Sequence, residues 1–301
     1  MAEQKKSRVG IDIGGTSIKA GLISHDGEMI SHRETPTPED PNNGMDKINA
    51  LITDWLDDSE DMIGVAAPGP MDLAKGIFLD PPNLKGWHDF PFVREFEEKN
   101  GKVCLFENDA NAAAVGEYYA GAGQDARSMV YITISTGIGA GIVLNGQLLS
   151  GAQFSAGEVG NMIISGDGPK QVGLNIGSWE ALASGTAIKK KVLDVYQSDG
   201  GAKELITKVG ENESDAVHIF NDWIAHLAAG IANLVHVINP EMIVLGGGVM
   251  QGKDAILPKL IPAVEERVYV SLRDSIQIQP AQLGTKAGVV GASYLPVVKR
   301  I

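Results

Sequence analysis

The chain is poor in the residues that build disulfides, metal sites and membrane spans. It has one cysteine, Cys104, which excludes an internal disulfide and fits a reducing cytoplasm. Because Cys104 lies in an apolar segment, we expect a small buried side chain rather than a nucleophile. The histidines show no metal-ligand spacing, and no stretch approaches the ~18 consecutive apolar residues of a membrane span. Residues 1–8 lack the apolar segment of a signal peptide, so we expect a cytoplasmic protein without membrane attachment.

Positive charge is also scarce. The chain has 25 lysines and arginines against 38 acidic residues, and the net charge of −13 argues against nucleic acid as a partner. This balance does not exclude ATP, because local geometry and Mg²⁺ bind a nucleotide. With 44% hydrophobic and 21% charged residues the chain can bury a large core, and its 301 residues are typical of two domains.

Two segments repeat one pattern, an apolar strand followed by a tight turn and a second strand. They cover residues 9–16 and residues 130–139. The turns combine glycine with the hydroxyls of Thr16, Ser135 and Thr136, so each can offer backbone N–H groups and a hydroxyl to an oxyanion. We predict that the pair holds a polyphosphate from two sides of a cleft; the alternative is two ordinary glycine-containing hairpins. Neither turn has the spacing of a P-loop or of a dinucleotide fingerprint.

The rest of the chain alternates predicted strands and helices, which indicates an α/β fold. Residues 35–43 are expected to form a loop, and residues 45–57 a helix. One helix is expected over residues 178–196 and another over residues 216–237, while residues 76–88 are expected to be irregular.

Polar residues that follow the predicted strands are candidates for chemistry. Asp109 follows an apolar strand and opens an alanine-rich helix, so it is either the N-cap of that helix or a catalytic base in a cleft. Asn108, Glu158 and Glu180 lie among small residues, which leave room for a ligand. Their oxygens can accept hydrogen bonds from sugar hydroxyls. Residues 246–248, three glycines after another apolar strand, are either a plain turn or a place where backbone lies against adenosine.

Together these motifs resemble the ROK family of bacterial sugar kinases, within the fold shared by actin, hexokinase and heat-shock chaperone ATPases. The resemblance covers almost the whole chain, from Gly10 to Ala292. The matching motifs are residues 12–16 with Lys19, 67–70, 107–112, 136–141, 157–160, 179–185, 239–241 and 246–249.

The resemblance implies a duplicated, ribonuclease-H-like α/β fold of two lobes with sugar and ATP in the cleft between them. The expected small lobe is residues 1–112 with residues 287–301, and it holds the first phosphate turn and part of the sugar site. The expected large lobe is residues 113–286, with the second phosphate turn, the adenosine site, the rest of the sugar site and the contacts of a homodimer. Closure of the lobes would exclude water from the reaction.

The resemblance also implies a role for each matching residue. Asp109 takes the proton from the sugar 6-hydroxyl as it attacks the γ-phosphate, and Asp12 orients Mg²⁺ through water. The implied sugar-binding residues are Gly69, Asn108, Asp109, Glu158, Asn161 and Glu180. The implied ATP-binding residues are Asp12, Gly14, Gly15, Thr16, Lys19, Thr136, Gly137, Gly139, Gly247 and Gly248.

One loop departs from the family pattern. The family has a histidine after its Gly-Glu-x-Gly motif and three cysteines in the loop that follows, and together they bind a structural zinc ion. The corresponding residues here are Asn161, Gln171, Gly173 and Ser178, which cannot assemble that ligand set, so we predict no zinc. Asn161 also replaces a histidine that contacts the sugar in relatives, and an amide there can admit an N-acetyl group or a β-linked aglycone.

The resemblance therefore predicts an ATP-dependent hexose 6-kinase, with glucose as the first candidate substrate. N-acetylmannosamine kinase and β-glucoside kinase are the alternatives. A sugar-responsive repressor is a second class, but we expect no room for a DNA-binding domain before Arg8. An actin- or chaperone-like ATPase is a third class, against which Asn108, Asp109, Glu158 and Glu180 argue. The presence of Asp109 argues against a non-catalytic sugar sensor.

Overall fold

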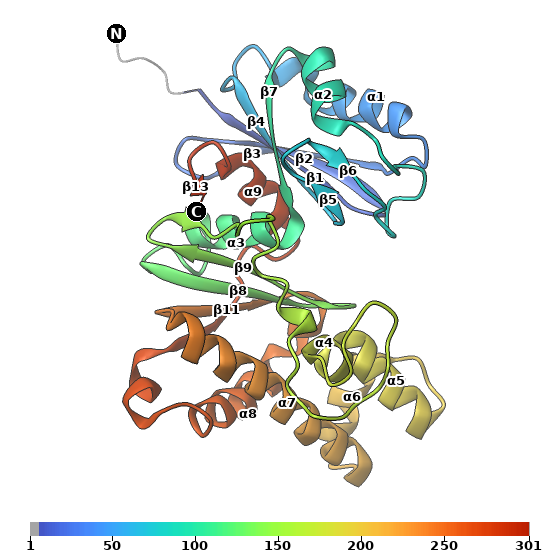
Figure 1. The fold of residues 1–301 in the computed structure, drawn as a ribbon, viewed down its shortest axis with the longest axis vertical. Helices are drawn as coiled ribbons and strands as arrows, with labels where there is room; N and C mark the ends of the chain where they lie inside the picture. Colours follow the sequence, from blue (N-terminus) through green and yellow to red (C-terminus); the bar gives the residue numbers. More distant parts are fainter. Residues whose placement is uncertain (1–5, 301) are drawn as a thin grey trace. The chain divides into compact units, whose positions relative to one another are not determined.

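The computed structural model describes residues 6–300; residues 1–5, on which the signal-peptide expectation partly rests, lie outside it. The described chain forms two compact units (Figure 1). Unit 1 comprises the chain up to Asp125, Gly141–Phe154 and the chain from Gln282, and unit 2 comprises Ala126–Ala140 and Ser155–Ala281. Unit 1 thus keeps helix α3 (Asp109–Ala120) whole. The expected lobe boundaries at 112/113 and 286/287 remain a prediction, because compactness does not locate a hinge.

Unit 1 is built on a five-stranded sheet with the order β3-β2-β1-β4-β7, in which β1 pairs antiparallel with β2 and parallel with β4. The strands are β1 (Arg8–Ile13), β2 (Ser17–Ile23), β3 (Met29–Pro36), β4 (Met62–Ala67) and β7 (Val103–Asn108). The helices are α1 (Pro41–Ile52), η1 (Thr53–Trp55), α2 (Phe92–Asn100), α3, η5 (Gly284–Lys286) and α9 (Ala287–Tyr294). Short pairings add β5 (Met71–Asp72) with β6 (Ile77–Phe78), and β10 (Gln147–Leu148) with β13 (Lys299–Arg300).

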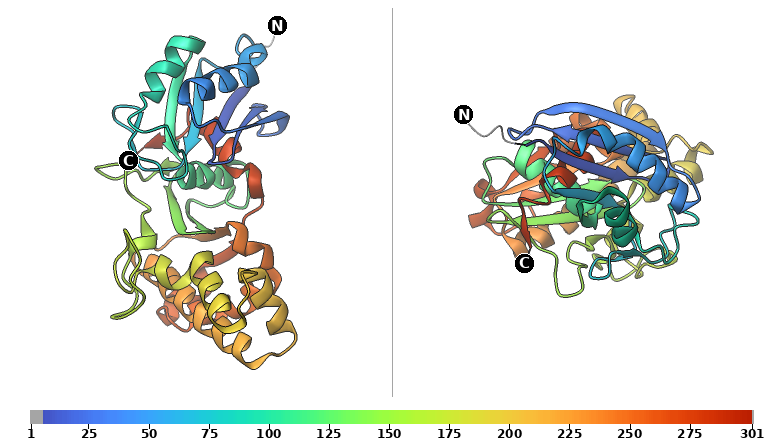
Figure 2. Two further views of the ribbon diagram at one scale, coloured as in Figure 1. Left: turned by 90° about the vertical axis from the view of Figure 1, so that its right-hand side faces the viewer. Right: turned by 90° about the horizontal axis from the view of Figure 1, so that it is seen from above.

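The alternation of side chains along a strand gives this sheet two different faces. Val9, Ile11 and Ile13 of β1 belong to the core that includes α1, α2 and a group of aromatic rings. Gly10 and Asp12 point to the other face, where α9 packs (Figures 1 and 2). Asp12 is therefore directed away from the main core of unit 1.

Helix α9 approaches its neighbours closely enough that only glycine fits at the crossings. A Cβ placed on Gly10 of β1 would lie 2.0 Å from the carbonyl oxygen of Val289, and one on Gly64 of β4 would lie 1.8 Å from that of Ala292. On the side of α3, a Cβ on Gly291 would lie 1.6 Å from the carbonyl oxygen of Ala112. Backbone-to-backbone contact thus joins α9 to two strands and to α3.

The predicted loop over residues 35–43 was wrong at both ends, because strand β3 extends to Pro36 and helix α1 begins at Pro41. Asp40 caps this helix by accepting from the N–H groups of Asn42 and Asn43 at 3.2 and 3.3 Å. Pro41 fits the first helical position, where no N–H is needed.

The single helix predicted over residues 178–196 is instead two helices, α4 (Trp179–Ala183) and α5 (Gly185–Tyr196). Ser184 separates them, and its side chain caps α5 by accepting from the N–H of Ala187 at 3.2 Å. The region of residues 76–88 is likewise not wholly irregular, since it contains β6.

Unit 2 contains three parallel strands in the order β12-β11-β8, namely β8 (Ser128–Ile134), β11 (Met242–Gly246) and β12 (Gln277–Pro280). They belong to a sheet of order β12-β11-β8-β9-β10-β13, and the boundary between the units falls within β9 (Ile138–Leu144), after Ala140. Strand β11 is apolar and buried along its length, as expected of a parallel strand covered on both faces.

Helices α4 to α8 lie together beside β8 and β11 (Figures 1 and 2). Those not yet given are α6 (Gly201–Gly210), α7 (Ser214–Ile238) and α8 (Lys253–Glu265), with 3-10 turns η2 (Val159–Asn161), η3 (Gly248–Gly252) and η4 (Val270–Ser275). The ring of Trp179 lies against Gly230 of α7, where a Cβ would come within 2.1 Å of it. Within the described part of the chain, no helix has both the length and the apolar content that a membrane crossing requires.

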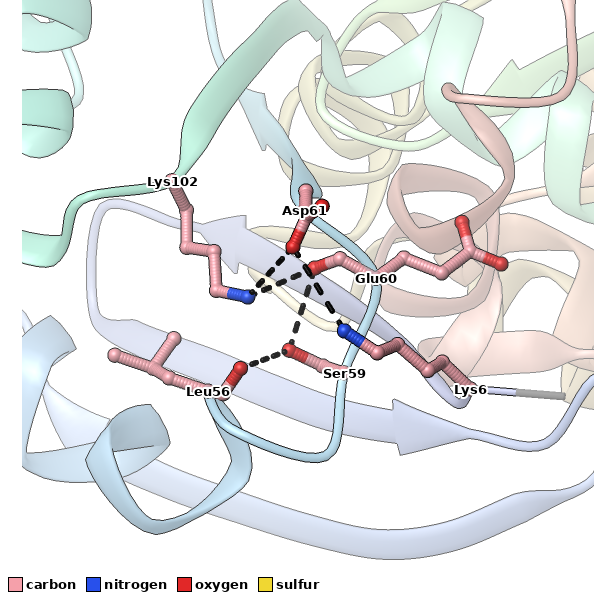
Figure 3. A network of polar contacts seen from close by, with 6 residues as sticks. All are labelled: Lys6, Leu56, Ser59, Glu60, Asp61 and Lys102. Atoms are coloured by element: carbon pink, nitrogen blue, oxygen red, sulfur yellow. Dashed lines mark hydrogen bonds and ion pairs between the residues drawn. The ribbon is translucent and has the colours of Figure 1, made fainter. Parts of the chain in front are cut away.

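A polar network ties the segment before β4 to its neighbours in unit 1 (Figure 3). The buried Ser59 donates to the carbonyl oxygen of Leu56 at 3.2 Å. Asp61 accepts from Lys102 at 3.3 Å and lies 3.9 Å from the Nζ of Lys6. Because the carboxylate of Asp61 is 86% exposed, we expect these ion pairs to contribute little to stability.

Candidate active site

The first predicted phosphate turn (residues 14–16) joins β1 to β2 in unit 1. Its carbonyl oxygens are held, because Thr37 donates its hydroxyl to Gly14 O at 2.6 Å and its N–H to Thr16 O at 3.1 Å. Gly15 and Thr16 are exposed. Their N–H groups donate no hydrogen bond within the part of the chain that the structure describes. The turn thus has a fixed shape and keeps two donors for a ligand.

Asp12 precedes this turn on the α9 face of the sheet. It lies opposite Lys19 in the register of β1 and β2, and its Oδ2 would be 2.7 Å from a Cβ on Gly288 of α9. Burial raises the pKa of Asp12 to about 6, with a further increase from the charge of Asp109 and a smaller opposing effect of Lys19. Asp12 is therefore a carboxylate whose charge a nearby cation would stabilise.

The junction of β7 and α3 presents Asn108 and Asp109. Asn108 is the N-cap, since its Oδ1 accepts from the N–H of Ala110 at 2.9 Å and of Asn111 at 3.4 Å. The alternative that Asp109 is the cap was therefore wrong: Asp109 is the first helical residue and its side chain is exposed. With its Oδ1 used in the cap, Asn108 has its Nδ2 left for a ligand. Gly69 lies nearby, where a Cβ would be 3.9 Å from that Nδ2.

A fully buried glutamate supports this junction from behind. The Oε1 of Glu107 accepts from the N–H of Asn108 at 2.9 Å and from the Nδ2 of Asn111 at 3.1 Å. Hydrogen bonds to a buried carboxylate are among the stronger ones, so Glu107 holds the backbone from which Asn108 and Asp109 project.

The second predicted phosphate turn (residues 135–137) joins β8 to β9 in unit 2. Its carbonyl oxygens are also held, since Gly185 donates its N–H to Ser135 O at 2.7 Å and Thr186 donates its hydroxyl to Thr136 O at 2.7 Å. The N–H groups of Thr136 and Gly137 have no acceptor among the described residues. Gly139, predicted with this turn, lies within strand β9.

Glu180, predicted to bind sugar, contacts the end of the second turn. Its Oε2 accepts from the N–H of Ile138 at 2.8 Å. The same oxygen would be 2.4 Å from a Cβ on Gly137 and 3.1 Å from one on Gly160. One oxygen of this carboxylate is therefore used to hold the turn.

The predicted adenosine-binding glycines lie beside the second turn. Gly247 has a φ of +90°, and a Cβ on it would lie 2.3 Å from the carbonyl oxygen of Ile134 at the end of β8. A Cβ on Gly248 would lie 3.9 Å from the Oγ of Ser135. Both the left-handed backbone and the close approach require glycine at position 247.

The loop that departs from the family pattern is closed by a pair of asparagines. The Oδ1 of Asn161 accepts from the N–H of Asn175 at 2.7 Å, and the Nδ2 of Asn175 donates to the carbonyl oxygen of Asn161 at 3.2 Å. Ser178, at a family zinc-ligand position, instead caps α4. No group of three His, Cys, Asp or Glu residues within residues 6–300 is placed to hold a metal ion. The absence of zinc remains a prediction.

The predicted site residues thus fall into two groups, one in each unit. Unit 1 brings together Asp12, Gly14, Gly15, Thr16, Lys19, Gly69, Asn108 and Asp109. Unit 2 contains Thr136, Gly137, Gly139, Glu158, Asn161, Glu180, Gly247 and Gly248, of which all but Gly137, Gly139 and Glu180 are exposed. The sequence analysis missed Thr37, Thr186 and the supporting role of Glu107; the only local signal was that Glu107 precedes two of the predicted residues.

Comparison with known proteins identifies the family of the chain. The family model described as "ROK family" matches residues 8–298. The chain belongs to the ROK family. A glucokinase of Halalkalibacterium halodurans is 33% identical to this ROK protein, over 95% of the chain and 94% of the relative.

Two solved structures show that the fold is the α/β fold of actin and hexokinase. One is a ROK hexokinase from Thermus thermophilus, with a TM-score of 0.86, 31% identity and coverage of 97% of this chain and 99% of that one. The other is a ROK family glucokinase from Streptomyces griseus in complex with glucose and AMPPNP, with a TM-score of 0.76 and 30% identity over 96% and 98% of the two chains.

Proposed function

We propose that this ROK protein is an ATP-dependent sugar kinase that phosphorylates the 6-hydroxyl of a hexose, with glucose as the first candidate. The observation that carries the proposal is the matched pair of turns, whose carbonyls are held while two N–H groups of each turn remain unpaired. Backbone N–H groups in such turns are suited to phosphate oxygens. Similarity to a glucokinase, and to a structure that holds glucose and a nucleotide analogue, supports the same function.

In the proposed mechanism, the two turns hold the phosphates and Asp109 accepts the proton of the attacking hydroxyl. Asp109 suits this role because it is exposed and projects from a backbone held by Glu107. Asn108 donates from its Nδ2 to a sugar oxygen, and Gly69 leaves space beside it. Phosphoryl transfer depends mainly on positioning and charge stabilisation, which these fixed groups can provide.

The residues present fit a bound Mg²⁺ ion, which would neutralise phosphate charge. Proteins bind this ion through one or two carboxylates together with substrate phosphates. Asp12 lies two residues before the first turn, and a pKa of about 6 leaves it mainly ionised at neutral pH. We propose that Asp12 orients the Mg²⁺ ion, that Lys19 belongs with Asp12 to the ATP-binding residues, and that Gly247 and Gly248 lie against adenosine.

A second candidate substrate is N-acetylmannosamine, because of the hydrogen bonds that the side chain of Asn161 makes. Its Oδ1 already accepts from the N–H of Asn175, whereas its Nδ2 donates no hydrogen bond to a described residue and is available to a ligand. A donor there can serve an acetamido oxygen as well as a hydroxyl. Glu158 and Glu180 complete the proposed sugar-binding set from unit 2.

The test is coupled ADP release with Mg·ATP across glucose, mannose, fructose, N-acetylglucosamine, N-acetylmannosamine and a β-glucoside. Glucose-dependent turnover supports a glucokinase, whereas preference for N-acetylmannosamine or the β-glucoside assigns the alternative substrate. ATP hydrolysis that needs no sugar would indicate an ATPase of the actin or chaperone type. Sugar binding without turnover would indicate a sensor or repressor. We also propose a cytoplasmic homodimer, which sedimentation equilibrium and cell fractionation would test.

A further inference from the structure

Glu117 is a fully buried carboxylate close to the end of α3, and it binds two segments that are distant in the sequence. Its Oε2 accepts from the N–H of Ala122 at 2.9 Å and of Gln282 at 3.1 Å. Its Oε1 accepts from the N–H of Leu283 at 2.8 Å. Both oxygens therefore serve backbone donors, and no side-chain cation takes part in these bonds.

The backbone of the same residue adds to the attachment. The carbonyl oxygen of Glu117 accepts from the N–H groups of Gly121 at 3.2 Å and Gly123 at 2.8 Å. Three consecutive N–H groups, those of residues 121–123, thus donate to Glu117 through its main chain or side chain. The chain is held against α3 as soon as the helix ends.

The two attached segments are places where the chain passes between the units. It first leaves unit 1 after Asp125, shortly after the first segment, and re-enters unit 1 for the last time at Gln282, the first residue of the second. The other two crossings lie at the two ends of Gly141–Phe154. The second segment continues through η5 into α9. One side chain therefore holds two of the four connections to the body of unit 1.

A buried carboxylate at the end of a helix lowers the stability of the fold unless the hydrogen bonds that it accepts offset the cost. A negative charge near the C-terminal end of a helix opposes the helix dipole, and burial of a charge is costly. Charge-assisted hydrogen bonds from three backbone donors offset that cost. Glutamine cannot replace the carboxylate, because its NH₂ group would face a backbone N–H.

We propose that Glu117 is a positioning residue that anchors two of the four inter-unit connections, the first and the last, to α3, the helix whose first residue is Asp109. The role of Asp109 as the base rests on the proposed function. The proposed function requires the phosphate turn at residues 135–137, in unit 2, and Asp109, in unit 1, to act on the same substrate. We therefore expect looser connections to slow the chemical step. The chemical step is then affected more than the binding of nucleotide.

The experiment compares wild type, Glu117→Gln and a matched control, Glu98→Gln, an exposed glutamate near the end of α2 in the same unit. Hydrogen exchange is measured on the amides of residues 121–124 and 282–286, with kcat for glucose and the Kd of a non-hydrolysable ATP analogue. In Glu117→Gln we expect exchange in both segments to rise by about tenfold or more. We expect kcat to fall by about tenfold or more while the analogue Kd changes by less than about twofold.

Gly121→Ala provides a second variant if Glu117→Gln does not fold. A Cβ on Gly121 would lie 2.2 Å from the Oε2 of Glu117, so it displaces the carboxylate without removing it. The same pattern of exchange and kcat is expected there. Unchanged exchange in either segment, or faster exchange with wild-type kcat, would overturn the proposal. If wild type shows no sugar-dependent turnover, the proposed function fails, and the exchange data alone decide whether Glu117 is the anchor.

Discussion

The two phosphate turns have the same framework but different neighbours. In each, a threonine from a later segment donates its hydroxyl to a turn carbonyl, Thr37 to Gly14 at 2.6 Å and Thr186 to Thr136 at 2.7 Å. The first turn follows Asp12, whereas the matching residue before the second turn is the uncharged Thr133. The second turn is instead contacted by the carboxylate of Glu180.

This comparison separates what a phosphate turn needs from what each half of the site adds. The held carbonyls and unpaired N–H groups are common to both turns. The ionisable groups differ. In unit 1 the carboxylate of Asp12 near the turn is available to a cation, and in unit 2 one oxygen of the Glu180 carboxylate holds the turn. We therefore expect variants of the shared framework to act alike and variants of the carboxylates to act differently.

The largest expected effect comes from Asp109, the proposed catalytic base. Asp109→Asn should lower kcat by about 10²–10⁴, with sugar and nucleotide affinities within a few-fold of wild type. The amide oxygen can still accept from the N–H of Ala110, so the start of α3 is retained. Single-turnover kinetics and calorimetry measure the two quantities, with the exposed Asp125→Asn as control. Turnover within a few-fold of wild type would show that Asp109 is not the base.

A smaller effect is expected at Glu180, where one carboxylate has two proposed tasks. In Glu180→Gln a single oxygen must serve either the N–H of Ile138 or the sugar, so kcat/KM for sugar should fall by about 10–10². The exposed Glu211→Gln in unit 2 is the control. If only the KM for ATP changes, Glu180 holds the turn and does not bind sugar.

The shared framework is tested by Thr37→Val and Thr186→Val. Each variant removes one hydroxyl that fixes a turn carbonyl, and we expect each to raise the KM for ATP by about 3–10-fold. Similar increases in the KM for ATP in the two variants would support the proposal that both turns bind phosphate. An effect in one variant alone would mean that only that turn binds phosphate.

The smallest expected effect is on stability: Asp12 should make the free energy of unfolding depend on pH, whereas Thr133, the matching residue of unit 2, should not. Burial raises the pKa of Asp12 from 3.8 to about 6. Between pH 3.8 and about pH 6 the folded protein therefore binds a proton on Asp12 that the unfolded chain has released. Stability without nucleotide should therefore fall as pH rises through this interval. At pH 7–8, Asp12→Asn should raise the free energy of unfolding by about 1–3 kcal/mol, a gain that disappears toward pH 4.

Urea unfolding across this pH range measures the gain, with Thr133→Val as the matched control. That variant changes the corresponding residue of unit 2 without removing a titratable group, so its effect should not depend on pH. A pH-independent difference between Asp12→Asn and wild type would contradict the raised pKa.

The sequence predicted those parts of the fold that depend on local pattern. The two strand–turn–strand segments and the helix after Asp109 follow from apolar periodicity and turn residues close together in the chain. The start of α1 was missed although Asp40 and Pro41 form a recognised start signal, because the whole segment was assigned to a loop. The break at Ser184 was missed because its cap acts within a continuous helical pattern.

The supporting residues of the site could not be predicted in this way. Thr37 and Thr186 reach the turns from segments whose position depends on the tertiary fold. Glu117 looks like an ordinary helical glutamate, and its donors at Gln282 and Leu283 are distant in the chain. The assignment of Asn108 as the cap required the direction in which its side-chain oxygen points.

The glycine crossings of α9 also restrict how the protein can evolve. Any replacement of Gly10, Gly64 or Gly291 adds a Cβ within 2.0 Å of a backbone oxygen, so no neighbouring side chain can shrink to compensate. These positions are closed to single-step change, and a random library will lose every member altered there. Substitution in an exposed loop such as that of Asn161 and Asn175 leaves the α9 crossings intact, so we expect sequence change to be tolerated better there.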